Sequence, residues 1–278
     1  MITPLSVPKK QQKLYIKNYQ TVTKNTDKLF LFAADQKMEH LNEDFFGPTL
    51  PEEINIPEHV FEIAKAGNAG AFATHLGLID RYAQNYPTIN YIAKLNGKTH
   101  KSPGDPYSNQ LWSIEQVLAL RETGINICGI GYTIYLGSEH EHAMMHQAAN
   151  LVFQAHQHGL LAILWIYPRG KNIEHEKSAA MLAGAAGVAV SLGADFVKIH
   201  APESGNALDL RQAVQAAGNT KVIVSGGATT NPQVCLEKIM AQLALGTVAG
   251  VAIGRNIFQH PLKEAIILSN KIADLIYR

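Results

Sequence analysis

Short hydrophobic runs that end in polar or glycine-rich turns recur along the whole chain. Eight of them begin near residues 29, 69, 89, 126, 161, 194, 221 and 250. Most of the stretches between them space their apolar residues as an amphipathic helix does, for example 139–158, 177–192, 208–217 and 231–244. Short buried strands that alternate with helices are typical of a parallel α/β fold.

The number of repeats favours a closed sheet. Eight strand–helix units predict a single (β/α)8 TIM barrel over 1–278, with 262–277 as its last helix and a short N-terminal helical arm before residue 29. A doubly wound open sheet is the alternative, because hydrophobic periodicity alone does not distinguish open from closed parallel sheets. The length of 278 residues suits one barrel, which typically needs about 250.

Composition narrows the possible functions. Charged residues make up 17% of the chain and the net charge is +1, which argues against a nucleic-acid binder. The longest apolar runs are too short to span a membrane. The two cysteines, Cys128 and Cys235, are far apart, and no hydrophobic leader precedes the polar stretch 9–28. We therefore expect a cytoplasmic protein.

Strand alternation identifies polar side chains that point into the barrel. In the run 194–200, Lys198 and His200 are expected to point inward, and in the run 161–170 Trp165 and Tyr167 are. The same parity directs Asp35 and Lys94 inward at the ends of the first and third strands. Because active sites of TIM barrels lie at the carboxyl ends of the strands, these groups are candidates for one site.

Lys198 has two interpretations. The simpler is a structural ion pair with an acid such as Asp35. The other is catalytic: burial and a second lysine, Lys94, lower the pKa of one amine below its usual value of about 10.4, and the neutral amine attacks a carbonyl to form a Schiff base. Tyr167 can then move the proton that carbon–carbon chemistry requires, or its ring can simply pack. Trp165 is expected to line the wall.

The loops after the last two strands favour a phosphate ligand. Ser225, Gly226 and Gly227 follow the seventh strand, and Gly254 and Arg255 follow the eighth. Loops at these positions commonly hold phosphate in TIM barrels, glycines let backbone N–H groups approach, and an arginine adds a charged contact. Either turn alone is also an ordinary strand-to-helix connection. Together they predict a phosphorylated carbonyl substrate.

Histidines near residue 140 raise the alternative of metal chemistry. His142 and His146 have i, i+4 spacing, and His140 lies close by, but no HExxH arrangement or further ligand is identifiable. We therefore predict no metal and no cofactor. His156 and His158 are expected at a solvated helix end.

Six motifs make the sequence resemble a known family. LNGKT (95–99), YLGSEHE (135–141), YPRG (167–170), DFVKI (195–199), SGGAT (225–229) and GVAIGRNIFQ (250–259) occur in the order found in archaeal-type class I fructose-bisphosphate aldolases. The resemblance implies that Lys198 forms the Schiff base, Tyr167 transfers protons and Asp35 is the acid of the first strand. It also implies a phosphate site at Ser225, Gly226, Gly227, Gly254 and Arg255, and a homo-oligomer.

The first-strand motif departs from that family. Family members commonly have Asp-His-Gly-x-Glu-His-Gly, whereas this chain has Asp35-Gln36-Lys37-Met38-Glu39-His40-Leu41. Lys37 either meets a second phosphate or faces solvent. The identity of the acceptor aldehyde is therefore the least determined part of the resemblance.

The loop 97–110 follows the third predicted strand and so lies on the active face, where it could act as a lid.

Three functions remain open at this point. The first is reversible cleavage of fructose 1,6-bisphosphate to dihydroxyacetone phosphate and glyceraldehyde 3-phosphate. The second is a related transaldolase-like enzyme, such as a 2-amino-3,7-dideoxy-D-threo-hept-6-ulosonate synthase, which shares the lysine and the phosphate loops but uses another acceptor. Lys94 and Trp165 are expected to contact the substrate of the aldolase, together with the phosphate-site residues. The third is a barrel that binds a sugar phosphate without turnover.

Overall fold

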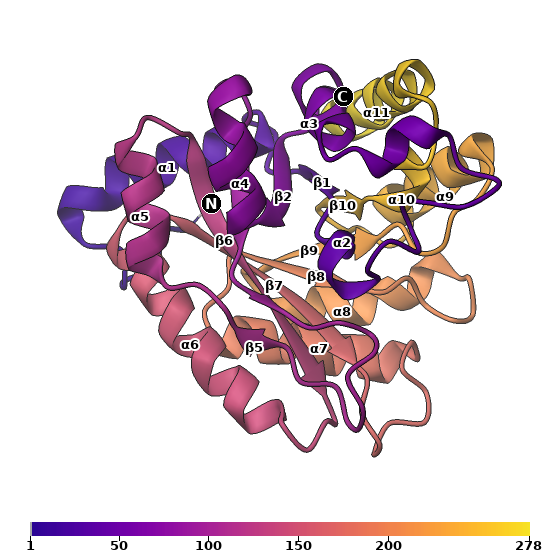
Figure 1. The fold of residues 1–278 in the computed structure, drawn as a ribbon. Helices are drawn as coiled ribbons and strands as arrows, with labels where there is room; N and C mark the ends of the chain where they lie inside the picture. Colours follow the sequence, from indigo (N-terminus) through magenta and orange to yellow (C-terminus); the bar gives the residue numbers. More distant parts are fainter. Residues whose placement is uncertain (1) are drawn as a thin grey trace.

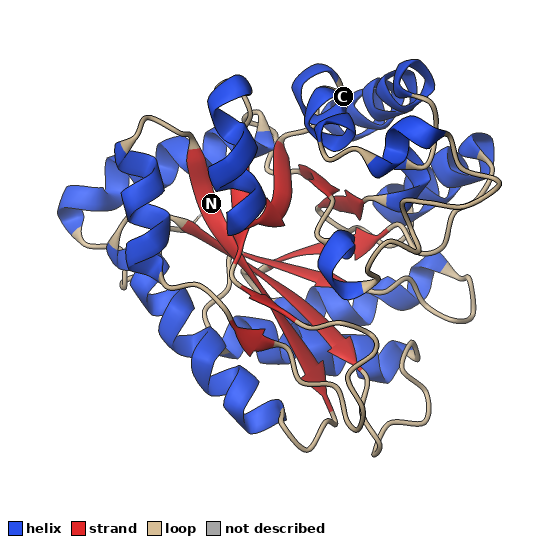
Figure 2. Ribbon diagram, viewed as in Figure 1, coloured by secondary structure: helices blue, strands red, loops and turns tan. Residues whose placement is uncertain are grey.

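The computed structural model describes residues 2–278, and its main sheet is a closed parallel barrel (Figures 1 and 2). Around the barrel the strand order is β1-β10-β9-β8-β7-β6-β3-β2. The strands are β1 (Leu29–Ala33), β2 (Ala71–His75), β3 (Tyr91–Lys94), β6 (Ile127–Leu136), β7 (Leu161–Pro168), β8 (Phe196–Ile199), β9 (Lys221–Ser225) and β10 (Gly250–Ile253). Each of the eight predicted runs supplies one strand. The barrel prediction is confirmed, and the open-sheet alternative is wrong.

Helices surround this barrel (Figure 2). The longer ones are α1 (Lys9–Thr23), α3 (Glu58–Ala66), α4 (Leu76–Tyr82), α5 (Ile114–Glu122), α6 (Glu141–Gln157), α7 (Ala179–Ser191), α8 (Leu210–Ala217), α9 (Pro232–Ala244) and α11 (Leu262–Tyr277). Short turns of helix are α2 (Gln36–Glu39), α10 (Arg255–Phe258), η1 (Glu52–Asn55), η2 (Ala83–Asn85) and η3 (Ala207–Asp209). No helix within residues 2–278 is both long and apolar enough to cross a membrane.

Alternation along the strands separates two hydrophobic cores, as the parity argument predicts. Phe30 and Leu164 belong to the outer core between strands and helices. Leu31, Ile163 and Phe196 belong to the inner core that fills the barrel. The inner core is apolar up to the level of Trp165, so polar side chains are concentrated above it at the carboxyl ends of the strands.

The predicted N-terminal arm closes the opposite end of the barrel. Its helix α1 lies near the beginnings of β6 and β7 (Figure 1). Tyr15, Tyr19 and Val22 repeat at helical spacing and join the inner core, where the Tyr19 ring stacks on Phe196 with centroids 5.6 Å apart. The arm therefore buries the apolar residues that would otherwise face solvent at this end.

One histidine expectation is wrong. His156 is only 1% exposed, and its ring nitrogens contact Ser6 Oγ at 2.7 Å and Asp195 Oδ2 at 3.2 Å. The helical arm covers this end of α6, which helix periodicity alone does not reveal. His156 is thus part of the contact between arm and barrel rather than a solvated helix end.

The loop 97–110 is anchored at the mouth of the barrel. Its ends form a small antiparallel pair, β4 (Asn96–Gly97) with β5 (Asn109–Gln110). Asp105 accepts hydrogen bonds from the backbone N–H groups of Glu139 and Lys171, both at 2.8 Å. These contacts join the loop to the segments that follow β6 and β7. Whether it also closes over a ligand stays a prediction.

Candidate functional site

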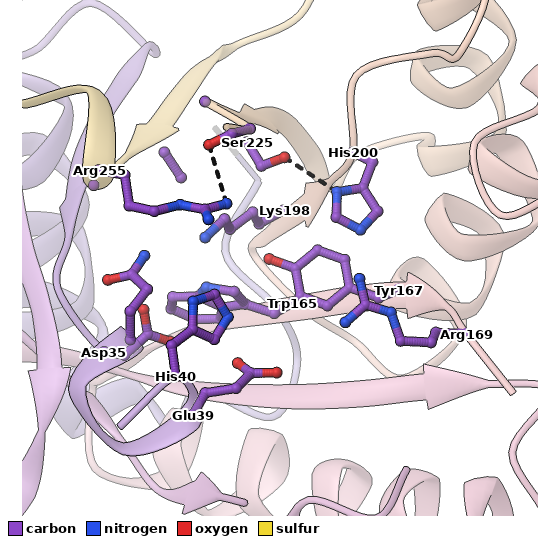
Figure 3. A pocket seen from close by; sticks show the side chains of 15 residues that line it. Asp35, Glu39, His40, Trp165, Tyr167, Arg169, Lys198, His200, Ser225 and Arg255 are labelled. Atoms are coloured by element: carbon purple, nitrogen blue, oxygen red, sulfur yellow. Dashed lines mark hydrogen bonds between the residues drawn. The ribbon is translucent and has the colours of Figure 1, made fainter. Parts of the chain in front are cut away.

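The carboxyl ends of β1, β7, β8, β9 and β10 surround a polar cavity (Figure 3). The cavity is lined by Asp35, Gln36, Glu39, His40, Trp165, Tyr167, Arg169, Lys198, His200, Ser225, Gly226, Gly227, Ala252, Gly254 and Arg255. All the site residues predicted from the sequence are among them except Lys94. Segments separated by more than 200 residues in the sequence thus contribute to one site.

Lys198 lies at the base of this cavity because of strand register. The parallel pairing of β7 and β8 places Trp165 beside Lys198, and Lys198 Nζ is 5.5 Å from the centre of an indole ring. Lys94 Nζ is 5.6 Å from the Trp165 ring. A Cβ atom at Gly131 would be 2.4 Å from this ring, so only glycine at that position leaves room for Trp165. The amines of both lysines therefore lie close to the same indole.

The two lysines share one carboxylate. Lys94 Nζ is 3.8 Å from Asp35 Oδ2, and the three side chains are nearly inaccessible to solvent. Burial lowers the pKa of Lys198, and the Lys94 charge lowers it further, although Asp35 opposes both effects. Burial would raise the pKa of Asp35, but Lys94 and Lys198 hold it below its ordinary value. The site thus favours an ionised Asp35 and a readily deprotonated Lys198.

Lys94 differs from the other predicted site residues. It does not line the cavity; its amine lies behind the wall, where it donates to Asn96 O at 3.2 Å and pairs with Asp35. Burial lowers the pKa of Lys94, with Asp35 acting in the opposite direction. The geometry favours a role through Asp35 and Lys198 rather than direct contact with a ligand.

Tyr167 stands one step nearer the mouth. Its ring stacks on His200 with centroids 4.4 Å apart, and the Arg169 guanidinium is 6.0 Å from its centre (Figure 3). Burial raises the pKa of Tyr167 well above its ordinary value, and the negative charges of Asp35 and Glu39 add to this effect. In the free protein Tyr167 is therefore a neutral phenol, able to donate a proton.

The loops after β9 and β10 are fastened to each other. Arg255 Nη2 donates to Gly227 O at 3.3 Å, and Arg255 Nη1 lies 3.7 Å from Asp44 Oδ1. Asn256, which is 1% exposed, donates to Gly226 O and Ala228 O, both at 3.1 Å. These bonds orient the glycine backbone and the guanidinium toward the same space, as an anion site requires.

The segment after β1 folds despite its departure from the family motif. Gln36 to Glu39 form α2, so position 37 does not need glycine, while Leu41 takes a left-handed φ of 53°. Lys37 Nζ bonds to Asn42 Oδ1 and Asn55 O at 3.2 Å, and it is not among the cavity-lining residues. Lys37 therefore holds the loop together rather than meeting a ligand at the cavity wall.

Several lining residues were not among the predicted site residues: Gln36, Glu39, His40, Arg169, His200 and Ala252. A signal existed for four of them. Strand parity points His200 inward, and Arg169 belongs to the YPRG motif. Glu39 ends α2 and His40 directly follows it, where strand parity gives no information, but both match the glutamate and second histidine of the family's first-strand motif. Tyr135 donates its hydroxyl hydrogen to Glu39, which fixes that carboxylate at the rim.

The histidines near residue 140 do not converge. Within residues 2–278, no group of three or more His, Cys, Asp or Glu side chains is placed to hold a metal ion. His146 Nε2 contacts Asn150, and His140 Nε2 lies 3.5 Å from Glu139 on the same segment. Each therefore has a local partner on its own helix or at its start.

Known proteins share both this sequence pattern and this fold. The sequence profile described as DeoC/LacD family aldolase matches residues 29–260. A protein of Methanocaldococcus jannaschii named fructose-bisphosphate aldolase/6-deoxy-5-ketofructose 1-phosphate synthase is 48% identical over 97% of this chain and 88% of its own length.

Two solved structures extend the comparison to the fold. A fructose-bisphosphate aldolase from Slackia heliotrinireducens superposes with a TM-score of 0.97 at 45% identity, covering 100% of this chain and 90% of the other. An archaeal fructose-1,6-bisphosphate aldolase gives a TM-score of 0.84 at 27% identity, covering 95% and 100%. In that second structure the catalytic lysine is covalently bound to the carbinolamine intermediate of the substrate.

Proposed function

Because the chain belongs to the DeoC/LacD family of aldolases, we propose that it is a class I aldolase that reversibly cleaves fructose 1,6-bisphosphate to dihydroxyacetone phosphate and glyceraldehyde 3-phosphate. The observation that carries the proposal is Lys198, a buried amine with a lowered pKa at the base of a cavity that also holds Tyr167 and Arg255. A sugar-phosphate-binding barrel without turnover has no need of that amine.

The reaction begins with the neutral amine of Lys198. Its nitrogen attacks the C2 carbonyl, and the carbinolamine then loses water to give a protonated iminium. Asp35, held ionised by Lys94 and Lys198, balances the positive charge that remains on the nitrogen. The phosphate on C1 binds at Gly227, Gly254 and Arg255, where backbone N–H groups and a guanidinium face the cavity; Gly226 also lines this site, but its N–H already donates to Ala252 O at 3.0 Å.

Tyr167 transfers the proton. Its pKa is high in the free protein, but the iminium adds a positive charge beside the ring and so stabilises the phenolate. Tyr167 then releases its proton to solvent, which supplies the proton that the carbinolamine takes up as it loses water. The phenolate removes the proton from the C4 hydroxyl, the C3–C4 bond breaks, and its electron pair enters the enamine. Glyceraldehyde 3-phosphate leaves, Tyr167 returns the proton to C3, and water releases dihydroxyacetone phosphate from Lys198.

The acceptor aldehyde defines a second candidate reaction. The 48% identical relative is also named a 6-deoxy-5-ketofructose 1-phosphate synthase, and this chain departs from the family motif at Gln36, Lys37 and Leu41. Cutting that product between C3 and C4 gives dihydroxyacetone phosphate and methylglyoxal. The same lysine and phosphate site can therefore form either product, and the acceptor side decides between them.

Product analysis tests both reactions. Purified protein with fructose 1,6-bisphosphate is expected to release both triose phosphates, and excess chelator is expected to leave the rate unchanged. Dihydroxyacetone phosphate is also supplied with glyceraldehyde 3-phosphate or with methylglyoxal, and the rates are compared. Absence of carbon–carbon cleavage or synthesis with every pair contradicts the proposal, as does a rate that requires added zinc.

A further inference from the structure

Buried polar atoms without partners are concentrated at the cavity. Among residues 2–278, three buried atoms of its lining have no hydrogen-bond partner: Gln36 Oε1, Trp165 Nε1 and His200 Nε2. Buried polar groups in folded proteins are nearly always paired. Unpaired atoms at the wall of a cavity therefore indicate bonds that a ligand completes. Of the three, Trp165 lies beside Lys198 itself, whereas His200 comes two residues after Lys198, nearer the mouth of the cavity.

That register puts His200 beside Tyr167. The β7–β8 pairing joins Trp165 to Lys198, so two residues further along the chain Tyr167, in β7, lies next to His200, which directly follows β8. The 4.4 Å stacking of their rings agrees with this placement. Residues two apart on a strand are about 6.6 Å apart along it. Both rings therefore stand one layer above Lys198, toward the mouth of the barrel.

A bound ketose must pass this layer. Its C2 atom is tied to Lys198, and its C1 phosphate lies at Arg255 and the glycine loops on the other side of the amine (Figure 3). The carbons beyond C3 consequently extend past Tyr167 and His200. In this half of the sugar every carbon carries an oxygen, and these oxygens need partners when the cavity excludes water.

The protonation of His200 suits it to such a bond. Burial lowers the pKa of His200 to about 3, and the charges of Arg169, Lys177 and Lys198 contribute. The imidazole is therefore neutral near pH 7, with one N–H donor and one acceptor nitrogen. Ser225 Oγ lies 3.3 Å from Nδ1. When the serine hydroxyl donates to Nδ1, the single imidazole proton is on Nε2, the nitrogen that has no partner.

Building on the proposed aldol reaction, we propose that His200 is a specificity-determining residue that donates its Nε2–H to a hydroxyl oxygen on the aldehyde half of the substrate. Ser225 positions it by donating to Nδ1. The Ser225 side chain is then bonded to His200, while Arg255 and the backbone N–H groups of the loop after β9 remain to bind the phosphate. This assigns recognition of the acceptor to the residue that directly follows β8, the strand that carries Lys198.

The test compares two acceptors with one variant. His200→Phe keeps a ring that can stack on Tyr167 but removes both nitrogens. With saturating dihydroxyacetone phosphate, kcat/KM is measured for D-glyceraldehyde and for propanal, a three-carbon aldehyde without hydroxyl groups. In the variant, kcat/KM for glyceraldehyde is expected to fall about 10-fold, which corresponds to the loss of one hydrogen bond. The kcat/KM for propanal is expected to change little.

Two further variants serve as controls. Ser225→Ala is expected to lower the preference for glyceraldehyde over propanal by a smaller factor, because the tautomer of His200 is no longer fixed. His260 also has a buried, unpartnered Nε2 but lies outside this cavity, so His260→Phe is expected to leave the preference unchanged.

The outcomes separate this inference from the proposed function. If His200→Phe lowers kcat/KM equally for both acceptors, or for neither, the assignment of His200 as a specificity-determining residue is overturned. Borohydride trapping of dihydroxyacetone phosphate on the wild-type protein is run in parallel. Failure of that trapping overturns the proposed aldol chemistry, whereas trapping together with an unchanged acceptor preference overturns only the role of His200.

Discussion

Lys198 is a lysine that is buried almost completely, where a charged ammonium group is destabilised, and its neighbours determine how readily it loses its proton. Asp35 stabilises the ammonium form, while burial and Lys94 destabilise it. Strand alternation is sufficient to predict that Lys198, Tyr167 and Asp35 share one mouth of the barrel. It does not predict that Lys94 lies behind Asp35, because that depends on side-chain packing around Trp165.

Removing the charge of Lys94 tests this balance. In Lys94→Met the like charge that lowers the pKa of Lys198 is gone, and Asp35 pairs with Lys198 alone, so the pKa of Lys198 rises. The neutral amine then forms only at higher pH. We expect the acidic limb of the kcat/KM profile to move to higher pH, measured by initial rates across pH. An acidic limb that stays in place or moves to lower pH contradicts the role of Lys94 in lowering the pKa of Lys198.

Tyr167→Phe separates proton transfer from Schiff-base formation. The change removes one oxygen and keeps the ring that stacks on His200. We expect turnover to fall by about 10²-fold or more, the usual contribution of a general acid–base group, while borohydride trapping on Lys198 continues. Rapid-quench measurements of both steps check this. An equal loss in the two steps means that Tyr167 acts only through packing.

At the scale of elements, the site depends on how β10 meets β1. Gly254 follows β10, and a Cβ atom there would be 2.2 Å from Ala33 O and 2.8 Å from Gln36 Nε2. The loop that carries Arg255 can therefore approach the first strand only because this residue has no side chain. The sequence motif identifies the glycine, but the backbone atom it must accommodate is visible only in the closed barrel.

Gly254→Ala is expected to displace the Arg255 loop. The extra methyl group meets backbone rather than a movable side chain, so we expect a loss of about 1–3 kcal/mol in unfolding free energy together with a raised KM for the phosphorylated substrate. Urea unfolding and kinetics measure the two effects. Gly184 in α7 is the matched control, because a Cβ there meets nothing within 4 Å.

Gly184→Ala is expected to stabilise the protein by about 0.5–1 kcal/mol, since alanine loses less backbone entropy in a helix, and to leave KM unchanged. If both glycine variants behave alike, the steric argument for Gly254 is wrong.

Elements differ in how well the sequence predicts them. The predicted last helix, 262–277, agrees with α11, and the amphipathic helices between strands are found within a few residues of their expected ends. The short pair β4–β5 and the burial of His156 are not predicted, because each arises from contacts between residues that are apart in the sequence, and the turn α2 is only four residues long, too short for a periodic pattern. Local periodicity cannot report such contacts.

At the scale of the whole molecule, the two ends of the barrel have different tasks. The carboxyl end of the strands holds the polar cavity, and the other end is closed by α1 and a buried network around Asp195. Asp195 accepts hydrogen bonds from Tyr15 and from Ala162 N, and it contacts His156 Nε2. Changes at this end are therefore expected to affect stability rather than chemistry. Assembly into a homo-oligomer stays a prediction from the family resemblance.

Asp195→Ala tests that division. It leaves buried donors of Tyr15 and Ala162 without an acceptor, so we expect a loss of about 3 kcal/mol or more in unfolding free energy. The kcat of the folded fraction is expected to stay near the wild-type value. Urea denaturation and active-site titration measure the two quantities. A large fall in kcat without loss of stability shows that the two ends are coupled.

The measurement that tests the central claim most directly is reductive trapping. Protein is incubated with dihydroxyacetone phosphate and borohydride, digested, and mapped by mass spectrometry, with Lys198→Met as the control. An iminium on Lys198 predicts one reduced adduct on the peptide that contains Lys198 and none in the control. No adduct, or an adduct on Lys94 in place of Lys198, contradicts the account.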